Sequence, residues 1–151
     1  MIKLNLGCGD KKIDGYVNID MRPECCPDEV CNIGAMGLRY PDSSVDEVRA
    51  FDFLEHIEMI DCVFVIREIY RVLRHGGRFE HFTPSTDGRG AFMDLTHRSF
   101  WNINTWLYFT HEVWRALYGY KMNFRVIELR DIITDNALRI IHTYGVFEAV
   151  K

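Results

Sequence analysis

The stretch covering residues 1–20 constrains the fold of this chain more than any other. Residues 3–6 form a short run that predicts a buried strand, and a glycine turn at residues 7–9 follows directly. A second apolar run over residues 16–19 predicts another strand, which leads into Asp20. Glycines permit positive φ and let a backbone approach a ligand closely, and a carboxylate can accept hydrogen bonds from two ribose hydroxyls. This order of elements is typical of a nucleotide-binding crossover.

The rest of the chain continues as an α/β protein. Further strands are predicted at residues 29–33, 45–51, 78–83, 124–129 and 138–150, the last two as an antiparallel pair at one edge and the very last with a break near Gly145. The connections at residues 7–15 and 21–28 are too short for full crossover helices, which need a dozen or more residues. The pattern therefore predicts a nucleotide-binding fold with trimmed helices near its N-terminus.

Two helices and one long loop complete the predicted elements. Apolar residues at helical spacing predict a helix over residues 62–73, capped by Asp61 and ended by the glycines at 75–77. An aromatic-rich helix is expected over residues 105–118. Residues 85–102 have little periodicity, and a loop of that length in a compact domain is usually functional. We expect it to form a lid over a binding pocket.

Composition narrows the class of protein. A length of 151 residues fits one domain over 1–151, and a net charge of −4 gives no sign of a nucleic-acid binder. No apolar run is long enough to span a membrane, and the chain enters a strand at once, so no signal peptide is expected. The five cysteines are odd in number and irregularly spaced, which favours reduced thiols in a cytoplasmic protein. Cys25, Cys26 and Cys31 are not expected to bind zinc, because adjacent cysteines rarely both reach one tetrahedral ion.

Three strings in a fixed order connect the chain to a known family. They are LNLGCGD…GYVNID, YPDSSVDEV…FLEHI and IREIYRVLRHGGRF…TPS. On these motifs, which extend to about Ser85, the chain resembles the class I S-adenosylmethionine-dependent methyltransferases, in particular the small methyltransferase type 11-like proteins. The resemblance implies a Rossmann-like α/β sheet, mostly parallel with one antiparallel edge strand. It also implies that S-adenosylmethionine lies across the carboxyl ends of the first strands.

The resemblance also implies which residues bind the cofactor. Position by position, they are Gly7, Cys8, Gly9, Asp20, Met21, Asn32, Ile33 and Phe51. Asp20 would hold the ribose hydroxyls, and Phe51 with Asp52 would border the sulfonium. The chain departs from the family pattern at Asn5 and Asn32, where an acid is frequent, although both side chains can still form hydrogen bonds.

The string Asp52-Phe53-Leu54-Glu55-His56 carries the main candidates for chemistry. Its spacing places Asp52, Glu55 and His56 on one face of a helical turn, and with His97 they form a ligand set suited to a divalent ion. It is similar to the metal site of certain O-methyltransferases. In the alternative, Glu55 and His56 only hold local structure, as in many family members. Asp52, His56 and His97 are the predicted catalytic residues, with His97 as base, metal ligand or merely a structural cap.

The resulting prediction is an S-adenosylmethionine-dependent methyltransferase. Its acceptor would be an oxygen or nitrogen of a small molecule, sugar or nucleotide-type compound. A homodimer is left open, because five aromatic residues are expected to form core or a dimer contact rather than a substrate cage: Trp101, Trp106, Tyr108, Phe109 and Trp114. A catalytically silent binding module is the alternative of another class. A nicotinamide-dependent enzyme is disfavoured because the glycine loop lacks the last glycine of that motif.

Overall fold

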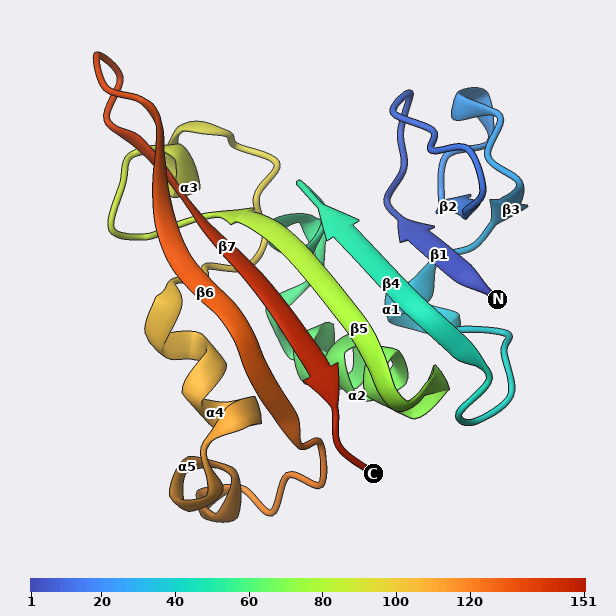
Figure 1. Ribbon diagram of the computed structural model, residues 1–151. Helices are drawn as coiled ribbons and strands as arrows, with labels where there is room; N and C mark the ends of the chain where they lie inside the picture. The colour runs from blue at the N-terminus through green and yellow to red at the C-terminus, as the bar shows by residue number, and fades with distance from the viewer.

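The fold is built on one mixed sheet, and the computed structural model describes all residues, 1–151 (Figure 1). Its seven strands lie in the order β3-β2-β1-β4-β5-β7-β6. They are β1 (Lys3–Leu6), β2 (Val17–Asp20), β3 (Glu29–Val30), β4 (Val45–Phe51), β5 (Leu73–Pro84), β6 (Phe124–Asp135) and β7 (Ile140–Ala149). The first five strands pair in parallel, and β7 pairs antiparallel with both β5 and β6. The predicted sheet, with its antiparallel pairing at one edge, is confirmed.

The helices are short and unevenly distributed along the chain. They are α1 (Ile33–Met36), α2 (Cys62–Val72), α3 (Gly90–Met93), α4 (Leu107–Thr110) and α5 (Glu112–Leu117), with 3₁₀ turns η1 (Pro23–Cys25), η2 (Leu54–His56), η3 (Met59–Asp61) and η4 (Ile103–Trp106). No α-helix connects β1 to β2 or β2 to β3, as the short connections predicted. None of the helices has the length and hydropathy needed to cross a membrane.

The core lies between one face of the sheet and α2. Val65, Ile66 and Ile69 lie at helical spacing and are completely buried. Further along the same layer, Trp106 packs on Phe79, with ring centroids 5.8 Å apart. This packing leaves the carboxyl ends of the parallel strands uncovered, and ligands bind at these strand ends in open α/β folds.

The end of α2 differs from the prediction. The helix ends at Val72, and the residues predicted to form its glycine cap belong to β5. Leu73 pairs with Val45 of β4, so sheet pairing prevails over the local glycine signal. Asp61 makes no side-chain cap, because η3 runs directly into the helix.

Three other elements differ in extent. β3 ends at Val30, and Asn32 instead caps α1 by accepting from the N–H of Ala35 at 3.3 Å. The predicted aromatic helix is interrupted at His111, whose backbone is extended, and this break brings Tyr108 edge-on to Trp114 at 5.1 Å. β6 is longer than predicted and extends to Asp135, whereas β7 is shorter, from Ile140 to Ala149, and runs through Gly145 without a break.

Candidate active site

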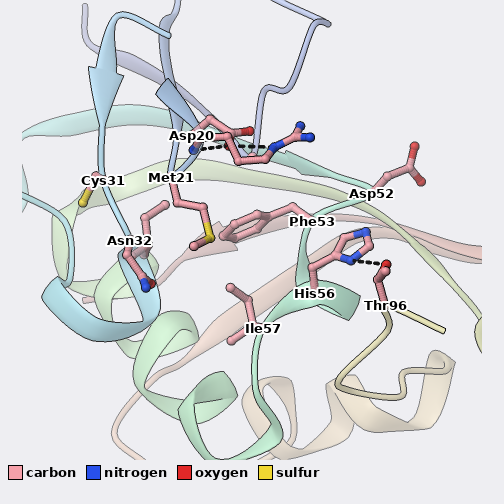
Figure 2. A pocket seen from close by; sticks show the side chains of 12 residues that line it. Asp20, Met21, Cys31, Asn32, Asp52, Phe53, His56, Ile57 and Thr96 are labelled. Carbon is pink, nitrogen blue, oxygen red and sulfur yellow. Dashed lines mark hydrogen bonds and ion pairs between the residues drawn. The ribbon is translucent and has the colours of Figure 1, made fainter. Parts of the chain in front are cut away.

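A first cavity of about 410 Å³ opens at the carboxyl ends of β1, β2 and β4 (Figure 2). Its lining includes seven of the residues singled out from the sequence: Gly7, Asp20, Met21, Asn32, Ile33, Asp52 and His56. Its volume is within the range of small-molecule sites. The predicted glycine loop and the acid after it therefore do border one pocket.

The glycine loop is tied to the tip of β2 by its backbone. Gly7 has φ +63° and Gly9 has φ +47°, a region that L side chains rarely adopt. A Cβ on Gly7 would press into the Phe53 side chain, 2.9 Å from its Cβ. The N–H of Gly9 donates to Oδ2 of Asp20 at 2.8 Å. Both glycines are thus required by the local conformation.

Asp20 is the buried anion of the first cavity. Only 7% of it is exposed. Its Oδ1 accepts from the backbone N–H of Arg22 at 2.9 Å and lies 3.5 Å from the Arg22 guanidinium. Because an ionised carboxylate can accept about four hydrogen bonds, lone pairs remain for the hydroxyls of a ribose.

The walls of the first cavity are apolar. Met21, Phe53 and Ile57 converge on it, and Asn32 contributes a polar group at its rim (Figure 2). The Oδ1 of Asn32 is used by the cap of α1, which leaves its amide N–H groups free to donate. An apolar slot with a polar edge suits an adenine ring.

Three of the predicted cofactor residues do not line the first cavity: Cys8, Gly9 and Phe51. Phe51 is turned to the opposite face of the sheet, 3.7 Å below the Arg49 guanidinium. Phe53 takes its place in the first cavity, because β4 ends at Phe51 and the positive φ of Asp52 turns the chain back over the glycine loop. Gly9 does not line the first cavity, but its N–H binds Asp20, which does. Cys8 is buried and its N–H bonds to Ile19 O at 3.1 Å; burial raises the pKa of its thiol.

A second cavity of about 530 Å³ adjoins the first. Asp52 and His56 line both cavities, so they form the boundary between them. No lysine or arginine lines the second cavity. Its titratable groups are carboxylates and imidazoles, those of Asp52, Glu55, His56, Asp94, His97 and His142. The second cavity is the natural place for an acceptor next to the cofactor.

Asp52 is held in an unusual conformation. Its φ is +49°, which is rare for a residue other than glycine, and its N–H donates to Phe82 O at 2.8 Å. Its carboxylate lies 3.4 Å from Lys11 Nζ and 3.7 Å from His142 Nε2. Such outliers persist where the surrounding structure enforces them, frequently at functional sites.

His97 lies in the second cavity and not in the first. Its ring meets His56 edge to face, with centroids 5.2 Å apart. Two backbone bonds bring the segments together, since Glu55 O accepts from the N–H groups of Arg98 at 2.7 Å and Ser99 at 3.1 Å. Three of the four predicted metal ligands thus meet, because one ligand atom each of Glu55, His56 and His97 lies within 4.8 Å of the others. Asp52 does not belong to this group.

The pKa values of two carboxyl groups in the second cavity are shifted in opposite directions. Glu55 is 2% exposed, and this burial raises the pKa of its carboxyl to about 8. Asp94 accepts from the backbone and hydroxyl of Thr96, which lowers its pKa. Arg98 lies 3.7 Å from Glu58 rather than pairing with Asp94.

Sequence reasoning missed His142. It lies on β7, stacks on Phe82 at 4.2 Å and bonds through Nδ1 to the Thr134 hydroxyl at 2.8 Å. Burial lowers the pKa of its imidazole, so the neutral form prevails near neutral pH. Nothing in the local sequence distinguishes it, because its position depends on the antiparallel pairing of β5 with β7.

Comparisons with known proteins agree with this geometry. The sequence profile of the methyltransferase domain family Methyltransf_11 matches residues 4–80. Among solved structures, Burkholderia thailandensis 1,6-didemethyltoxoflavin-N1-methyltransferase, with that compound and S-adenosylhomocysteine bound, has a TM-score of 0.68 at 15% identity, covering 99% of this chain and 71% of that one. No sequence of a curated protein matches the chain.

Two further solved structures share the fold. The N-methyltransferase NodS of Bradyrhizobium japonicum, in complex with S-adenosylhomocysteine, has a TM-score of 0.68 at 13% identity, covering 99% of this chain and 78% of that one. The putative methyltransferase of Haloferax volcanii, in complex with the activator Trm112, has a TM-score of 0.69 at 17% identity, covering 99% and 82%.

The glycine loop, Asp20 and the order of the sheet define a Rossmann-like nucleotide-binding protein. Because the profile covers half of the sequence, the chain belongs to the Methyltransf_11 methyltransferase domain family. It is a class I S-adenosylmethionine-dependent methyltransferase.

Proposed function

We propose that this methyltransferase methylates an oxygen or nitrogen of a small molecule, sugar or nucleotide-type compound held in the second cavity. The observation that carries the proposal is the shared boundary: Asp52 and His56 line both cavities. A cofactor in the first cavity and an acceptor in the second would meet at these two residues. Two of the solved structures above are N-methyltransferases, which supports a nitrogen acceptor alongside oxygen.

The residues of the first cavity fit the cofactor. Asp20 would hold the ribose hydroxyls, the glycine loop would pass beside the ribose and the methionine part, and Met21 with Ile33 would border the adenine. When bound, S-adenosylmethionine supplies an electrophilic methyl group on a sulfonium. The positioning of two reactants in adjoining cavities converts a bimolecular reaction into an effectively intramolecular one.

The second cavity supplies bases for the acceptor proton. In the transfer, the acceptor atom would take up the methyl group in exchange for its proton, and that proton would pass to a protein base. His97 offers Nε2 for this role, because its Nδ1 lies 2.9 Å from Ala91 O and so carries the hydrogen. Asp52 at the boundary is placed to orient the acceptor.

Residues 85–102 are proposed as a lid on the second cavity. Both ends are held, since Thr86 N–H donates to Trp101 O at 2.8 Å and Asn102 Nδ2 to Thr86 Oγ1 at 2.9 Å. The middle lines the second cavity with apolar side chains that are largely exposed, Met93 at 56% and Leu95 at 94%. Hydrogen exchange around Leu95 should slow when cofactor and acceptor are both bound. Equal exchange in the free and doubly bound protein would contradict the lid.

One experiment tests the activity. Purified protein is incubated with labelled S-adenosylmethionine and a library of amine, hydroxyl and nucleoside compounds, and methylated products are identified by mass spectrometry. The expected result is transfer to at least one acceptor and loss of that transfer in Asp20→Ala. Cofactor binding without any transfer would favour the silent binding module instead.

Compartment and assembly are part of the same proposal. A cytoplasmic location is supported by the five cysteines, which are all free thiols. A homodimer stays a prediction. Trp101, Trp106 and Phe109 are buried in the core, so among the aromatic residues considered for such a contact Trp114, at 38% exposed, is the most available. Light scattering of the purified protein measures its mass directly.

A further inference from the structure

The cluster of Glu55, His56 and His97 is built into the fold rather than scattered on its surface. The first two residues lie on η2, and the third lies on the loop that the backbone of Glu55 holds through the N–H groups of Arg98 and Ser99. One ligand atom of each lies within 4.8 Å of the others. The ligand atoms are thus brought together by hydrogen bonds that do not involve them.

The hydrogen bond of His97 determines which of its nitrogens is free. Its Nδ1 lies 2.9 Å from Ala91 O, and a carbonyl can only accept, so Nδ1 must carry the hydrogen. The lone pair of the neutral ring is then on Nε2. The nearest carboxylate oxygen, Oδ2 of Asp94, lies 3.9 Å from Nε2, which is too far for a hydrogen bond.

The same reasoning applies to His56. The Thr96 hydroxyl donates its single hydrogen to Asp94 Oδ1 at 2.7 Å, so towards His56 Nδ1, at 3.4 Å, it can only accept. His56 therefore presents Nδ1–H to Thr96, a contact drawn in Figure 2, and keeps the lone pair on Nε2. Histidines that bind metals are oriented in this way by a partner on the other ring nitrogen.

The carboxylate of Glu55 lacks a partner of its own. The residue is 2% exposed, and its Oε2 has no hydrogen-bond partner in the protein. A buried and unpaired carboxylate oxygen is costly. No lysine or arginine lines the second cavity that could form an ion pair with the ionised Glu55, which agrees with the raised pKa of its carboxyl. A cation between this oxygen and the two Nε2 atoms would remove that cost.

We propose that Glu55, His56 and His97 bind a divalent first-row transition-metal ion, such as Zn²⁺, through the Glu55 carboxylate and the two Nε2 atoms. Two neutral imidazoles with one carboxylate are a ligand set of catalytic zinc and of non-haem iron. Mg²⁺ and Ca²⁺ prefer oxygen ligands and fit this set poorly. The site opens into the second cavity, so a coordination position remains for an oxygen or nitrogen of the acceptor. The binding of the ion does not depend on the methyl transfer proposed above. With the ion bound, the Nε2 lone pair of His97 is a ligand, so His97 serves as a base only in the metal-free protein.

The test measures metal binding without cofactor or acceptor. Full-length protein is freed of metal and titrated with Co²⁺, whose visible absorption reports nitrogen ligation, and the bound Co²⁺ is then displaced with Zn²⁺. One ion per chain is expected, and millimolar Mg²⁺ should not displace it. Glu55→Gln and His97→Asn should each weaken binding about 100-fold or more. Thr96→Val, which keeps every ligand but removes the acceptor of His56 Nδ1–H, should weaken it about tenfold.

His111→Asn is the matched control, because this exposed histidine lies between α4 and α5, lines neither cavity and should leave binding unchanged. Circular dichroism shows that each variant is folded, and if Glu55→Gln does not fold, His97→Asn decides. Absence of Co²⁺ binding at millimolar concentration, or equal binding by wild type and His97→Asn, would overturn the proposal. Binding of an organic ammonium compound at this cluster in place of the metal ion would also overturn the proposal. Calorimetry with S-adenosylhomocysteine on the same samples separates failure of the metal site from failure of the methyltransferase assignment.

Discussion

The imidazoles of His56 and His97 meet edge to face, with ring centroids 5.2 Å apart, at the floor of the second cavity. The segments that carry them are separated in the chain by η3, α2, β5 and α3. Each ring is oriented by an oxygen at Nδ1, Thr96 Oγ1 for His56 and Ala91 O for His97. The pair is therefore preorganised, with both Nε2 atoms available, before any ligand binds.

Asp20→Ala should weaken binding of S-adenosylhomocysteine. The substitution removes the proposed ribose contacts and also the acceptor of the Gly9 N–H. A loss of about 2 kcal/mol is expected, about 30-fold in affinity, allowing for partial replacement by water. Isothermal titration calorimetry measures it. Asp10→Ala, at an exposed acid of the same loop, is the control and should bind normally. Unchanged affinity in Asp20→Ala would move the ribose site elsewhere.

Gly7→Ala should impair both stability and cofactor binding. Its positive φ of +63° costs an L residue about 1–2 kcal/mol, and the added Cβ also displaces Phe53. Gly15→Ala is a matched control, because Gly15 has φ +80° with no atom within 4 Å of the added Cβ. Urea unfolding should show a loss for both variants, larger for Gly7→Ala. Only Gly7→Ala should also lose affinity for S-adenosylhomocysteine, and equal affinities would show that Phe53 tolerates the shift.

His97→Asn should lower turnover about 100-fold, the effect expected for loss of a general base. Affinity for S-adenosylhomocysteine should not change, because His97 does not line the first cavity. The melting temperature should change little if the ring serves chemistry rather than packing. His142→Asn, made in parallel, tests another of the three imidazoles that line the second cavity. A melting temperature that falls together with activity in His97→Asn would assign the residue to structure.

His81 should make the protein acid-sensitive. It is completely buried between Trp106 and Phe147, and its Nε2 has no hydrogen-bond partner. Burial lowers the pKa of its imidazole to about 3. The unfolded chain, with a histidine pKa of about 6.5, binds a proton that the folded chain excludes. The contribution of His81 to the free energy of unfolding is therefore fully present above about pH 6.5, and it is lost as the pH falls from there towards 3.

The measurement is urea unfolding at pH 7 and pH 5. The His81 contribution alone should reduce the free energy of unfolding by about 2 kcal/mol between these pH values. His81→Met, which has similar volume and no titrating group, should lose less stability over the same interval by about that amount. His111→Met should keep the wild-type pH dependence, since His111 is exposed. Parallel curves for wild type and His81→Met would show that the ring is protonated without unfolding.

Local sequence determined the framework of the first cavity. The strand, glycine turn, strand and Asp20 are contiguous, so the periodicity of two in β1 and β2 and the φ freedom of glycine were enough to predict the loop and its acid. The helical spacing of Val65, Ile66 and Ile69 likewise predicted α2. These features depend on interactions within a few residues, which a sequence pattern records directly.

Tertiary structure decided the rest of the site. Phe53 replaces Phe51 because the positive φ of Asp52 turns the chain back over the glycine loop. His142 enters the second cavity through the pairing of β5 with β7. His97 reaches His56 because Glu55 O binds two N–H groups of a distant loop. Such contacts join segments far apart in the chain through backbone groups that every residue carries. Residue types therefore suggested His97 as a ligand beside His56, but no spacing of side chains predicted the backbone contacts that bring the two together.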